Sequence, residues 1–297
     1  MTLMFFLWLA AQGGLLVAAA LAAGSGAGRR CAAGLLVLAA AILPWFASPL
    51  PFPRAALAAL SVMALFKTLQ ISTTPGPWPT GQRIWHGLMP FDVRRTRTVA
   101  SGLDWTLLAS VMAYGALAVA AILVGIRGLG GLNSPSRFLA AMTCTAVFLY
   151  ATFEVLAGLL RLAHRLVGID VPPIQRAPVL SRSAREFWGE RWNRTVSDWL
   201  GQFAFLPLAR RRHSGLGLLA AFAVSAAIHA WTILVALDAQ SALMAGSFFV
   251  VQGFVVLIEA RMRPQTWPPP LARLWTFLVL VLPSPLFLCP ISRLIGW

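Results

Sequence analysis

The sequence predicts an all-α integral membrane protein with about eight transmembrane helices and additional amphipathic helices on the cytoplasmic side. Of its 297 residues, 59% are hydrophobic and only 11% are charged. Soluble domains carry roughly 25% charged residues and do not hide this much apolar surface. Several apolar runs also reach the length of about 20 residues that a helix needs to cross the hydrocarbon layer. These observations exclude an ordinary soluble domain.

A scan with this length along the chain gives the candidate spans in order. Lys67 lies inside the third span. Pro283 and Pro285 interrupt the eighth, where they predict a kink in the helix. The predicted spans cover residues 3–23, 31–49, 55–72, 104–126, 138–161, 215–237, 241–260 and 272–292.

The first span ends in small residues, so a cleaved signal peptide is the alternative to a retained helix. No Lys or Arg precedes residues 3–23, and Arg29 and Arg30 follow them. This polarity favours a retained first span whose N-terminus faces outside.

The arginines predict the orientation of the remaining spans, because basic residues concentrate in cytoplasmic connections. With the N-terminus outside, both termini face outside and most arginines face the cytoplasm. The outer connections keep Arg54, Arg127, Arg137 and Arg293. The cytoplasmic connections hold Arg29, Arg30, Arg83, Arg94, Arg95, Arg97, the arginines from 161 to 212, Arg261, Arg263 and Arg273.

We expect residues 1–297 to form a single polytopic membrane domain. Two of its cytoplasmic segments, 73–101 and 166–214, are too long to be simple connectors. The first opens with a proline-rich run at residues 74–79. The second mixes tryptophan and arginine at helical spacing, which indicates amphipathic or re-entrant helices at the membrane interface. Long ordered loops on a rigid scaffold tend to carry function.

The net charge of +15 does not indicate nucleic acid, because the arginines lie in short segments between apolar runs. Arginines beside membrane spans indicate which connections face the cytoplasm, and they attract anionic lipid head groups. Cys31, Cys144 and Cys289 lie in or beside apolar runs without CxxC spacing. Neither a metal site nor a disulfide framework is therefore expected.

Ionisable residues inside a span are costly and mark candidate functional sites. The sequence places four there: Lys67, Glu154, His229 and Glu259. His229 can act as a general base near neutral pH, or it can be a structural histidine bonded to Ser225 or a neighbouring helix. Lys67 is expected to snorkel to the interface, and Glu259 to pair with Arg261 and Arg263. Glu154 is expected to face a cavity.

The segment 181–193, which we call the motif loop, is the second candidate. It contains Arg182, Arg185, Arg191, Trp188 and Trp192. One interpretation is an interfacial helix anchored by tryptophans, with arginines that bind phosphate. Asn193 favours a second interpretation, since an amide contributes little to burial but can donate to a developing oxyanion.

Residues 187–193, Phe-Trp-Gly-Glu-Arg-Trp-Asn, resemble a signature of the membrane-bound O-acyltransferases, and in particular of the wax synthase-like branch. That branch has Phe-Trp…Arg-Trp-Asn, then a proline, here Pro207, and then Ser-x-x-x-His, here Ser225 to His229. Weaker similarities are Phe66-Lys67 followed by Gly76-Pro77, and the phenylalanine-rich segment 248–253 followed by Glu259.

The resemblance implies a membrane-bound O-acyltransferase fold and the transfer of an acyl group from acyl-CoA to a hydroxyl group, without a further cofactor or metal. His229 and Asn193 would be catalytic. The substrate-binding residues would be Phe187, Trp188, Arg191, Trp192, Ser225 and Trp231. The expected partners are acyl-CoA, a lipophilic alcohol and membrane lipids, with no nucleic acid. A long-chain alcohol, which gives a wax ester, is the default acceptor of the branch.

Other interpretations stay open on the sequence alone. A secondary transporter or a non-enzymatic membrane scaffold would use similar ingredients. Within the enzyme interpretation, the acceptor can also be a sterol, a terpenoid or polyketide hydroxyl, or a sugar. The arginine-rich composition favours a bacterial inner membrane.

Overall fold

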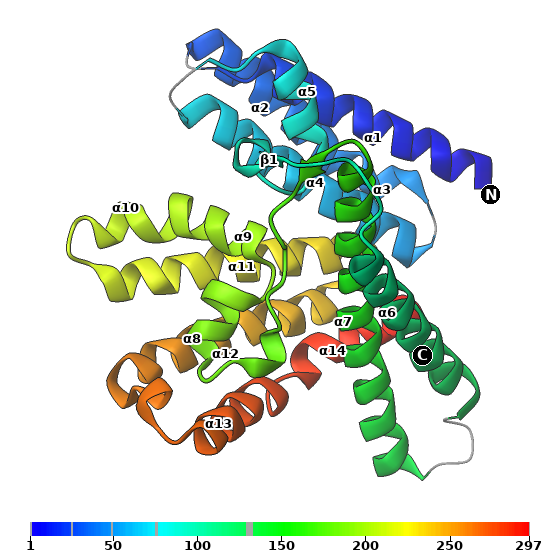
Figure 1. Cartoon of the computed structure of the whole chain (residues 1–297), viewed down its shortest axis with the longest axis vertical. Coiled ribbons are helices and arrows are strands. Elements are labelled where there is room, and N and C mark those ends of the chain that lie inside the picture. Colours follow the sequence, from blue (N-terminus) through cyan, green and yellow to red (C-terminus); the bar gives the residue numbers. More distant parts are fainter. Residues whose placement is uncertain (1, 25, 49, 75–76, 129–132, 297) are drawn as a thin grey trace. The chain divides into compact units, whose positions relative to one another are not determined.

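A computed structural model describes residues 2–24, 26–48, 50–74, 77–128 and 133–296 (Figure 1). Pro75 and Gly76, part of the predicted proline-rich run and of the Gly-Pro similarity, lie outside these residues. The described chain is helical apart from one pair of two-residue strands. It divides into two compact units, Met1–Arg94 with Ile228–Ala242, and Arg95–Ala227 with Leu243–Trp297.

The helices confirm the predicted fold class of an all-α integral membrane protein. Within the described residues, seven helices are long and apolar enough to cross a membrane. The pair α13 (Pro269–Val281) and α14 (Pro285–Ile295) is also apolar enough when taken together, and it is bent by 56° between its two helices, where Pro283 and Pro285 predicted a kink; such a pair is either a broken span or a re-entrant loop. The seven are Met4–Ala22, Ala27–Ala47, Pro51–Thr73, Trp105–Gly128, Ser134–Leu166, Ser214–Ala236 and Ala239–Met262.

In the first unit, small residues let three helices approach closely. These are α1 (Thr2–Ala22), α2 (Ala27–Ile42), which short α3 (Pro44–Ala47) extends, and α4 (Pro51–Thr73). A polar contact joins all three, because Gln12 donates to the Ser61 hydroxyl at 2.8 Å and to the Ala40 carbonyl at 3.3 Å. Inside an apolar bundle such hydrogen bonds between helices fix which helix faces meet.

The short helix α5 (Thr80–Leu88) lies against α1. Gly87 allows this approach, since a Cβ atom there would lie 2.8 Å from the Ala20 methyl group. Arg83 and Arg29 donate to carbonyls in the last turn of α1, at Ala23 and Ala22 respectively. Cationic donors satisfy the unpaired carbonyls of a helix C-terminus. Arg29 therefore has a structural role in addition to the topological role predicted from the sequence.

The second unit contains the α6–α7 hairpin, formed by α6 (Trp105–Leu123) and α7 (Ser134–Leu166). Asp104 caps α6 by accepting from the Leu107 N–H at 3.0 Å, and Asn133 caps α7 in the same way. Strands β1 (Arg97–Thr98) and β2 (Ile169–Asp170) pair antiparallel and bring together the chain ahead of α6 and the chain behind α7.

The rest of this unit contains most of α11 (Ser214–Ala236) and α12 (Ala239–Met262), together with α13 and α14. Gly253 on α12 packs directly on α11, since a Cβ atom there would lie 2.9 Å from the Phe222 Cβ. The segment 166–214 folds into short helices α8 (Ala184–Glu186), α9 (Arg194–Leu200) and α10 (Leu206–Ala209). Single π-helical turns, Phe187–Arg191 and Gly201–Phe205, separate them. Whether the segment re-enters the membrane stays a prediction.

Gly158 tests the packing of the α6–α7 hairpin. A Cβ atom there would collide with the Val111 side chain, so we expect Gly158→Ala to destabilise the protein by about 1–3 kcal/mol through overpacking. Thermal unfolding in detergent measures the effect, and adding Val111→Ala should recover most of it. Gly115 on α6 has nothing within 4 Å of its added Cβ, so Gly115→Ala is the matched control. An equal loss from both alanines would contradict this packing.

Candidate functional site

At the beginning of the motif loop, side chains of the loop itself cap the N-terminus of α8. The Ser183 hydroxyl accepts from the Glu186 N–H at 2.9 Å, which caps α8. The Glu186 carboxylate accepts from the Arg182 N–H at 2.7 Å and from the Arg191 guanidinium at 2.6 Å. Ser-x-x-Glu is the spacing of a capping box, and here the glutamate also closes the loop onto Arg191.

Glu259 on α12 fixes the motif loop to the helical scaffold. Its buried carboxylate accepts from the backbone N–H groups of Ala184 and Arg185 at 2.8 and 2.9 Å, and from the Trp275 indole at 2.7 Å. The expected pairing with Arg261 and Arg263 is wrong, because Glu259 is 2% exposed whereas both arginines are exposed. The first N–H groups of a helix satisfy a buried carboxylate well.

Trp188 lies against the phenylalanine-rich segment of α12. Its indole donates to the Gln252 amide oxygen at 2.9 Å, and the Gln252 amide nitrogen donates to the Val279 carbonyl on α13. The ring packs on Phe248 and Phe249, with centroids 6.1 and 5.7 Å away. The two segments that carry the family resemblance therefore contact each other.

Trp192 is held in an aromatic stack. Its ring lies parallel to Phe187, with centroids 5.5 Å apart, and near-parallel to Tyr150 of α7 at 6.3 Å. Phe153 meets its edge at 5.9 Å. Such a stack orients the indole plane and, with it, the backbone that leads to Asn193.

Residues 173–179 clamp the motif loop on both sides of Trp192 and Asn193. The Arg176 N–H donates to the Arg191 carbonyl at 2.9 Å, and the Arg194 N–H donates to the Ile174 carbonyl at 2.8 Å. The Arg191 guanidinium donates back to the Arg176 carbonyl at 3.0 Å. Arg191 is thus tied into the protein, and its role in substrate binding stays a prediction.

Asn193 adopts a left-handed backbone conformation, with φ 39° and ψ 61°, and caps α9. Its amide oxygen accepts from the Val196 N–H at 3.4 Å. Within the described residues its amide nitrogen donates to no protein group. Asparagine is among the few residues that tolerate this backbone conformation.

His229 lies half-buried on α11, one turn after the buried Ser225. Trp231 follows it on the same helix and is also half-buried. His229 and Trp231 belong to the first compact unit, and the motif loop and Ser225 belong to the second. The predicted pairing of His229 with Asn193 therefore stays a prediction.

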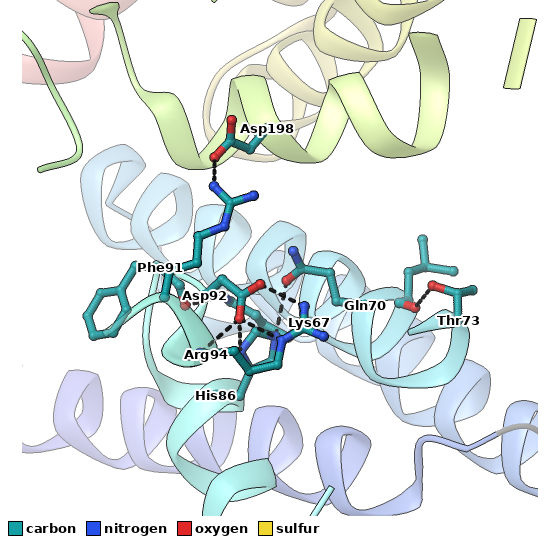
Figure 2. A network of polar contacts seen from close by, with 10 residues as sticks. Lys67, Gln70, Thr73, His86, Phe91, Asp92, Arg94 and Asp198 are labelled. Atoms are coloured by element: carbon teal, nitrogen blue, oxygen red, sulfur yellow. Dashed lines mark hydrogen bonds and ion pairs between the residues drawn. The ribbon is translucent and has the colours of Figure 1, made fainter. Parts of the chain in front are cut away.

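A buried polar cluster in the first unit was not foreseen (Figure 2). Lys67 does not snorkel to solvent; it is 3% exposed, and its ammonium donates to the Phe91 carbonyl at 2.7 Å. His86 is fully buried, with Nε2 3.1 Å from the Gln70 amide oxygen. Its Nδ1 lies 3.9 Å from the Asp92 carboxylate. The expectation that Lys67 snorkels was wrong because α5 packs on α1 and α4, and this packing also buries His86.

Electrostatics keep His86 neutral. Its burial, and then the charge of Lys67, lower the pKa of His86 to about 3, although Asp92 opposes them. Burial acts to raise the pKa of Asp92, but hydrogen bonds from Arg94 outweigh it and hold that pKa below its usual value. Arg94 makes a bidentate contact with this carboxylate, at 2.7 and 2.9 Å.

Glu154 lies on α7 and, as expected, faces a cavity. A pocket of about 270 Å³ is lined by Glu154, Tyr114, Tyr150, Arg161 and Gln175, among others. Tyr150 also stacks on Trp192, so this pocket adjoins the motif loop.

Comparison with known proteins confirms the resemblance. Residues 171–251 match the model of the membrane bound O-acyl transferase family, and this range contains Asn193, Ser225 and His229. A long-chain-alcohol O-fatty-acyltransferase of Simmondsia chinensis is 31% identical over 120 residues, 38% of this chain and 34% of the relative. A probable long-chain-alcohol O-fatty-acyltransferase of Arabidopsis thaliana is 28% identical over 143 residues, 45% of this chain and 41% of the relative.

A further probable long-chain-alcohol O-fatty-acyltransferase of Arabidopsis thaliana is 25% identical over 250 residues, 77% of this chain and 71% of the relative. The chain spans less than half the length of the first relatives it matches. The family match at residues 171–251 contains the motif loop and α11.

Glu259 gives a direct test of the scaffold. Glu259→Gln places an amide nitrogen against N–H donors, so we expect a loss of about 1–3 kcal/mol, measured as a lower unfolding temperature in detergent. Glu190→Gln is the matched control, because Glu190 is an exposed carboxylate of the same loop. If Glu259→Gln unfolds at the wild-type temperature, the buried carboxylate does not hold the loop.

The lowered pKa of His86 predicts the pH dependence of stability. The unfolded chain binds a proton near pH 6.5 and the folded protein only near pH 3, so stability falls as the pH drops below 6.5. Between pH 8 and pH 5 the expected loss is on the order of 2 kcal/mol. Asp92 contributes no loss in this range, since its stabilisation disappears only at lower pH.

Unfolding temperatures at pH 8 and pH 5 provide the measurement. We expect His86→Gln to remove this part of the pH dependence. His213→Gln should keep it, since His213 is exposed. Identical pH dependence in wild type and His86→Gln would show that His86 does not stay neutral in the folded protein.

Proposed function

We propose that this chain, whose residues 171–251 carry the membrane-bound O-acyltransferase pattern, transfers an acyl group from acyl-CoA to a lipophilic alcohol. A long-chain alcohol is the proposed acceptor and a wax ester the product. The observation that carries the proposal is the ordered motif loop. It holds Asn193, whose amide nitrogen donates to none of the residues that the structure describes, on a scaffold built from Glu259, Trp188 and Trp192.

His229 is the proposed general base. Its ring takes the proton of the acceptor hydroxyl while the oxygen attacks the thioester carbonyl. The resulting tetrahedral intermediate collapses, the carbon–sulfur bond breaks, and the protonated His229 returns the proton to the leaving thiolate. The products are the ester and free CoA. No acyl-enzyme is needed, so the transfer is direct within a ternary complex.

Asn193 is the proposed donor to the oxyanion of that intermediate. A preorganised donor aimed at developing charge typically contributes a few kcal/mol. The left-handed backbone, the cap of α9 and the clamp by residues 173–179 all hold this side chain in place. Such rigidity is what an oxyanion donor requires, since reorganisation during the reaction would reduce its effect.

The proposed orientation, with both termini outside in a bacterial inner membrane, places the motif loop on the cytoplasmic side, where CoA is found. Arg182, Arg191 and Arg194 donate to backbone carbonyls. Arg185 is exposed, and within the described chain its side chain has no hydrogen bond, so it is the best candidate to contact CoA phosphates.

Membranes containing the full chain, with labelled palmitoyl-CoA and hexadecanol, test the proposal. We expect wild type to form hexadecyl palmitate and His229→Ala to lose at least 100-fold of that rate, since general acid–base catalysis contributes about 10²–10⁴-fold. Asn193→Asp keeps the cap and the backbone conformation but removes the amide donor. We expect it to fold and to lose about 10²–10³-fold, as for other oxyanion donors.

His213→Gln is the control and should keep the wild-type rate, and size-exclusion chromatography confirms that each variant is folded. Full activity in folded His229→Ala would exclude this histidine as the base. Flux of a solute without ester formation would favour a secondary transporter. The absence of ester, CoA release and flux would favour a scaffold.

A further inference from the structure

The pocket beside the motif loop lies near the predicted cytoplasmic end of the α6–α7 hairpin. It has a volume of about 270 Å³ and lies between this hairpin and residues 173–179, within the second unit. On α7 the uncharged residues 138–153 span about 24 Å, somewhat less than the roughly 30 Å of the hydrocarbon layer. With Arg137 at the predicted outer end, Glu154 lies about one turn inside the cytoplasmic boundary and Arg161 lies beyond it. The pocket is therefore at the predicted depth of the cytoplasmic lipid head groups.

Glu154 and Arg161 bring opposite charges to this pocket without pairing with each other. Both side chains are half-buried, and Arg161 is close enough for its charge to act on the Glu154 carboxylate. Within the described part of the chain, neither of them takes part in an ion pair. The Arg161 Nε atom is buried and has no hydrogen-bond acceptor among the described residues. The pocket thus offers one cation and one anion to a ligand.

Gln175 adds a buried acceptor that the protein leaves unsatisfied. This residue lines the pocket and is 8% exposed. Its amide oxygen is buried, and no described residue donates to it. A buried acceptor without a donor costs free energy, which a ligand with an N–H or O–H group recovers.

These three groups together select the chemistry of the ligand. An anion alone would lie beside the Glu154 carboxylate, and a cation alone would lie beside the Arg161 guanidinium. A neutral ligand would leave both charges without a counter-charge. A zwitterion compensates both, with an anionic oxygen for Arg161 and an ammonium group for Glu154. The ammonium group must carry N–H bonds, because the Gln175 oxygen needs a donor.

We propose that this pocket binds the head group of phosphatidylethanolamine, a phospholipid that joins a phosphate to a primary ammonium. The phosphate lies at Arg161, and the ammonium donates to Glu154 and Gln175. Leu107 and Val179 line the same pocket and provide apolar contact for the glycerol and the first acyl carbons. Phosphatidylcholine does not fit equally well, since its quaternary ammonium has no N–H group. This inference goes beyond the proposed function and does not depend on it.

The pocket shares its walls with the motif loop, so a bound head group steadies that loop. Tyr150 lines the pocket and stacks on Trp192. Ile174 also lines the pocket, and its carbonyl accepts from the Arg194 N–H at 2.8 Å. A lipid that orders these walls therefore reduces local opening of residues 187–194.

Thermal unfolding of the full chain in phosphatidylcholine nanodiscs tests the site. The discs also contain an equal fraction of phosphatidylethanolamine, of phosphatidylglycerol or, as the reference, of further phosphatidylcholine, all with the same acyl chains. We expect phosphatidylethanolamine to raise the unfolding temperature of wild type by about 3–6 °C over the reference, the shift of a site filled at about ten times its Kd. Phosphatidylglycerol has the phosphate without the ammonium and should give a smaller shift.

Variants locate the effect. Glu154→Gln removes the negative charge that attracts the ammonium, and Arg161→Gln removes the positive charge that attracts the phosphate, so each should abolish the shift from phosphatidylethanolamine. Glu190→Gln and Arg137→Gln are the matched controls, since both residues are exposed and line no part of the pocket. Each control should keep the wild-type shift.

Gln175→Leu keeps the test decisive if a charge variant does not fold. It replaces an unsatisfied buried acceptor by an apolar side chain, so we expect it to unfold at or above the wild-type temperature in the reference discs. The additional shift from phosphatidylethanolamine should nevertheless be smaller than in wild type, because the ammonium loses one acceptor.

Two further measurements identify the source of the head group and its effect on the motif loop. Soluble glycerophosphoethanolamine, added to the reference discs, should give no shift, since it lacks the acyl chains that hold the lipid at the pocket. Hydrogen–deuterium exchange of residues 187–194 should be slower with phosphatidylethanolamine in wild type, and unchanged by it in Glu154→Gln. Equal exchange with and without the lipid in wild type would overturn the coupling to the motif loop.

The remaining outcomes decide the site itself. No shift from phosphatidylethanolamine over the reference, or a larger shift from phosphatidylglycerol, overturns the zwitterion site. A phosphatidylethanolamine shift that survives in Glu154→Gln and Arg161→Gln places the lipid elsewhere and also overturns it. A shift from glycerophosphoethanolamine as large as that from the lipid overturns the lipid as the source. None of these measurements uses turnover, so their failure leaves the proposed acyltransferase in place, and the absence of ester leaves the lipid site in place.

Discussion

The buried carboxylate of Glu259 is the contact on which the candidate site depends. A charge at this depth in an apolar helix is costly unless donors surround it. Three donors do so here, two from the start of α8 and one from Trp275 of α13. One side chain of α12 thereby satisfies a helix N-terminus and ties two distant segments to a membrane helix. If the motif loop left the scaffold, this buried carboxylate would lose two of its three donors and keep only the Trp275 indole.

Beyond Glu259, further contacts of its tryptophans hold the motif loop in place. Trp188 donates to Gln252, which in turn donates to a carbonyl of α13, and Trp192 stacks on Tyr150 of α7. The clamp by residues 173–179 closes the loop from the other side. Each π-helical turn adds a residue to the helix and so turns aromatic side chains towards different neighbours. Phe187 consequently meets both tryptophans, Trp188 edge-on and Trp192 face-on.

Hydropathy was sufficient to predict the spans, because crossing the hydrocarbon layer requires a length and composition that a single helix displays by itself. The bend at Pro283 and Pro285 is equally local. The polar contacts were not predictable in this way. Glu259 meets Ala184 across 75 residues of sequence, and Lys67 meets Phe91, in the connection after α5, across 24 residues. Arg261 and Arg263 were the plausible partners by proximity along the chain, but both are exposed whereas Glu259 is buried.

Asn193 shows why residue type alone did not decide between a structural and a catalytic role. Its position requires a positive φ, which asparagine tolerates, and a cap for α9, which asparagine provides with its amide oxygen. Both requirements leave the amide nitrogen unused, and an oxyanion needs that nitrogen. Aspartate would meet the two structural requirements as well as asparagine does, but it would present a second acceptor where a donor is needed. The residue is therefore explained fully only when the local backbone and the proposed chemistry are considered together.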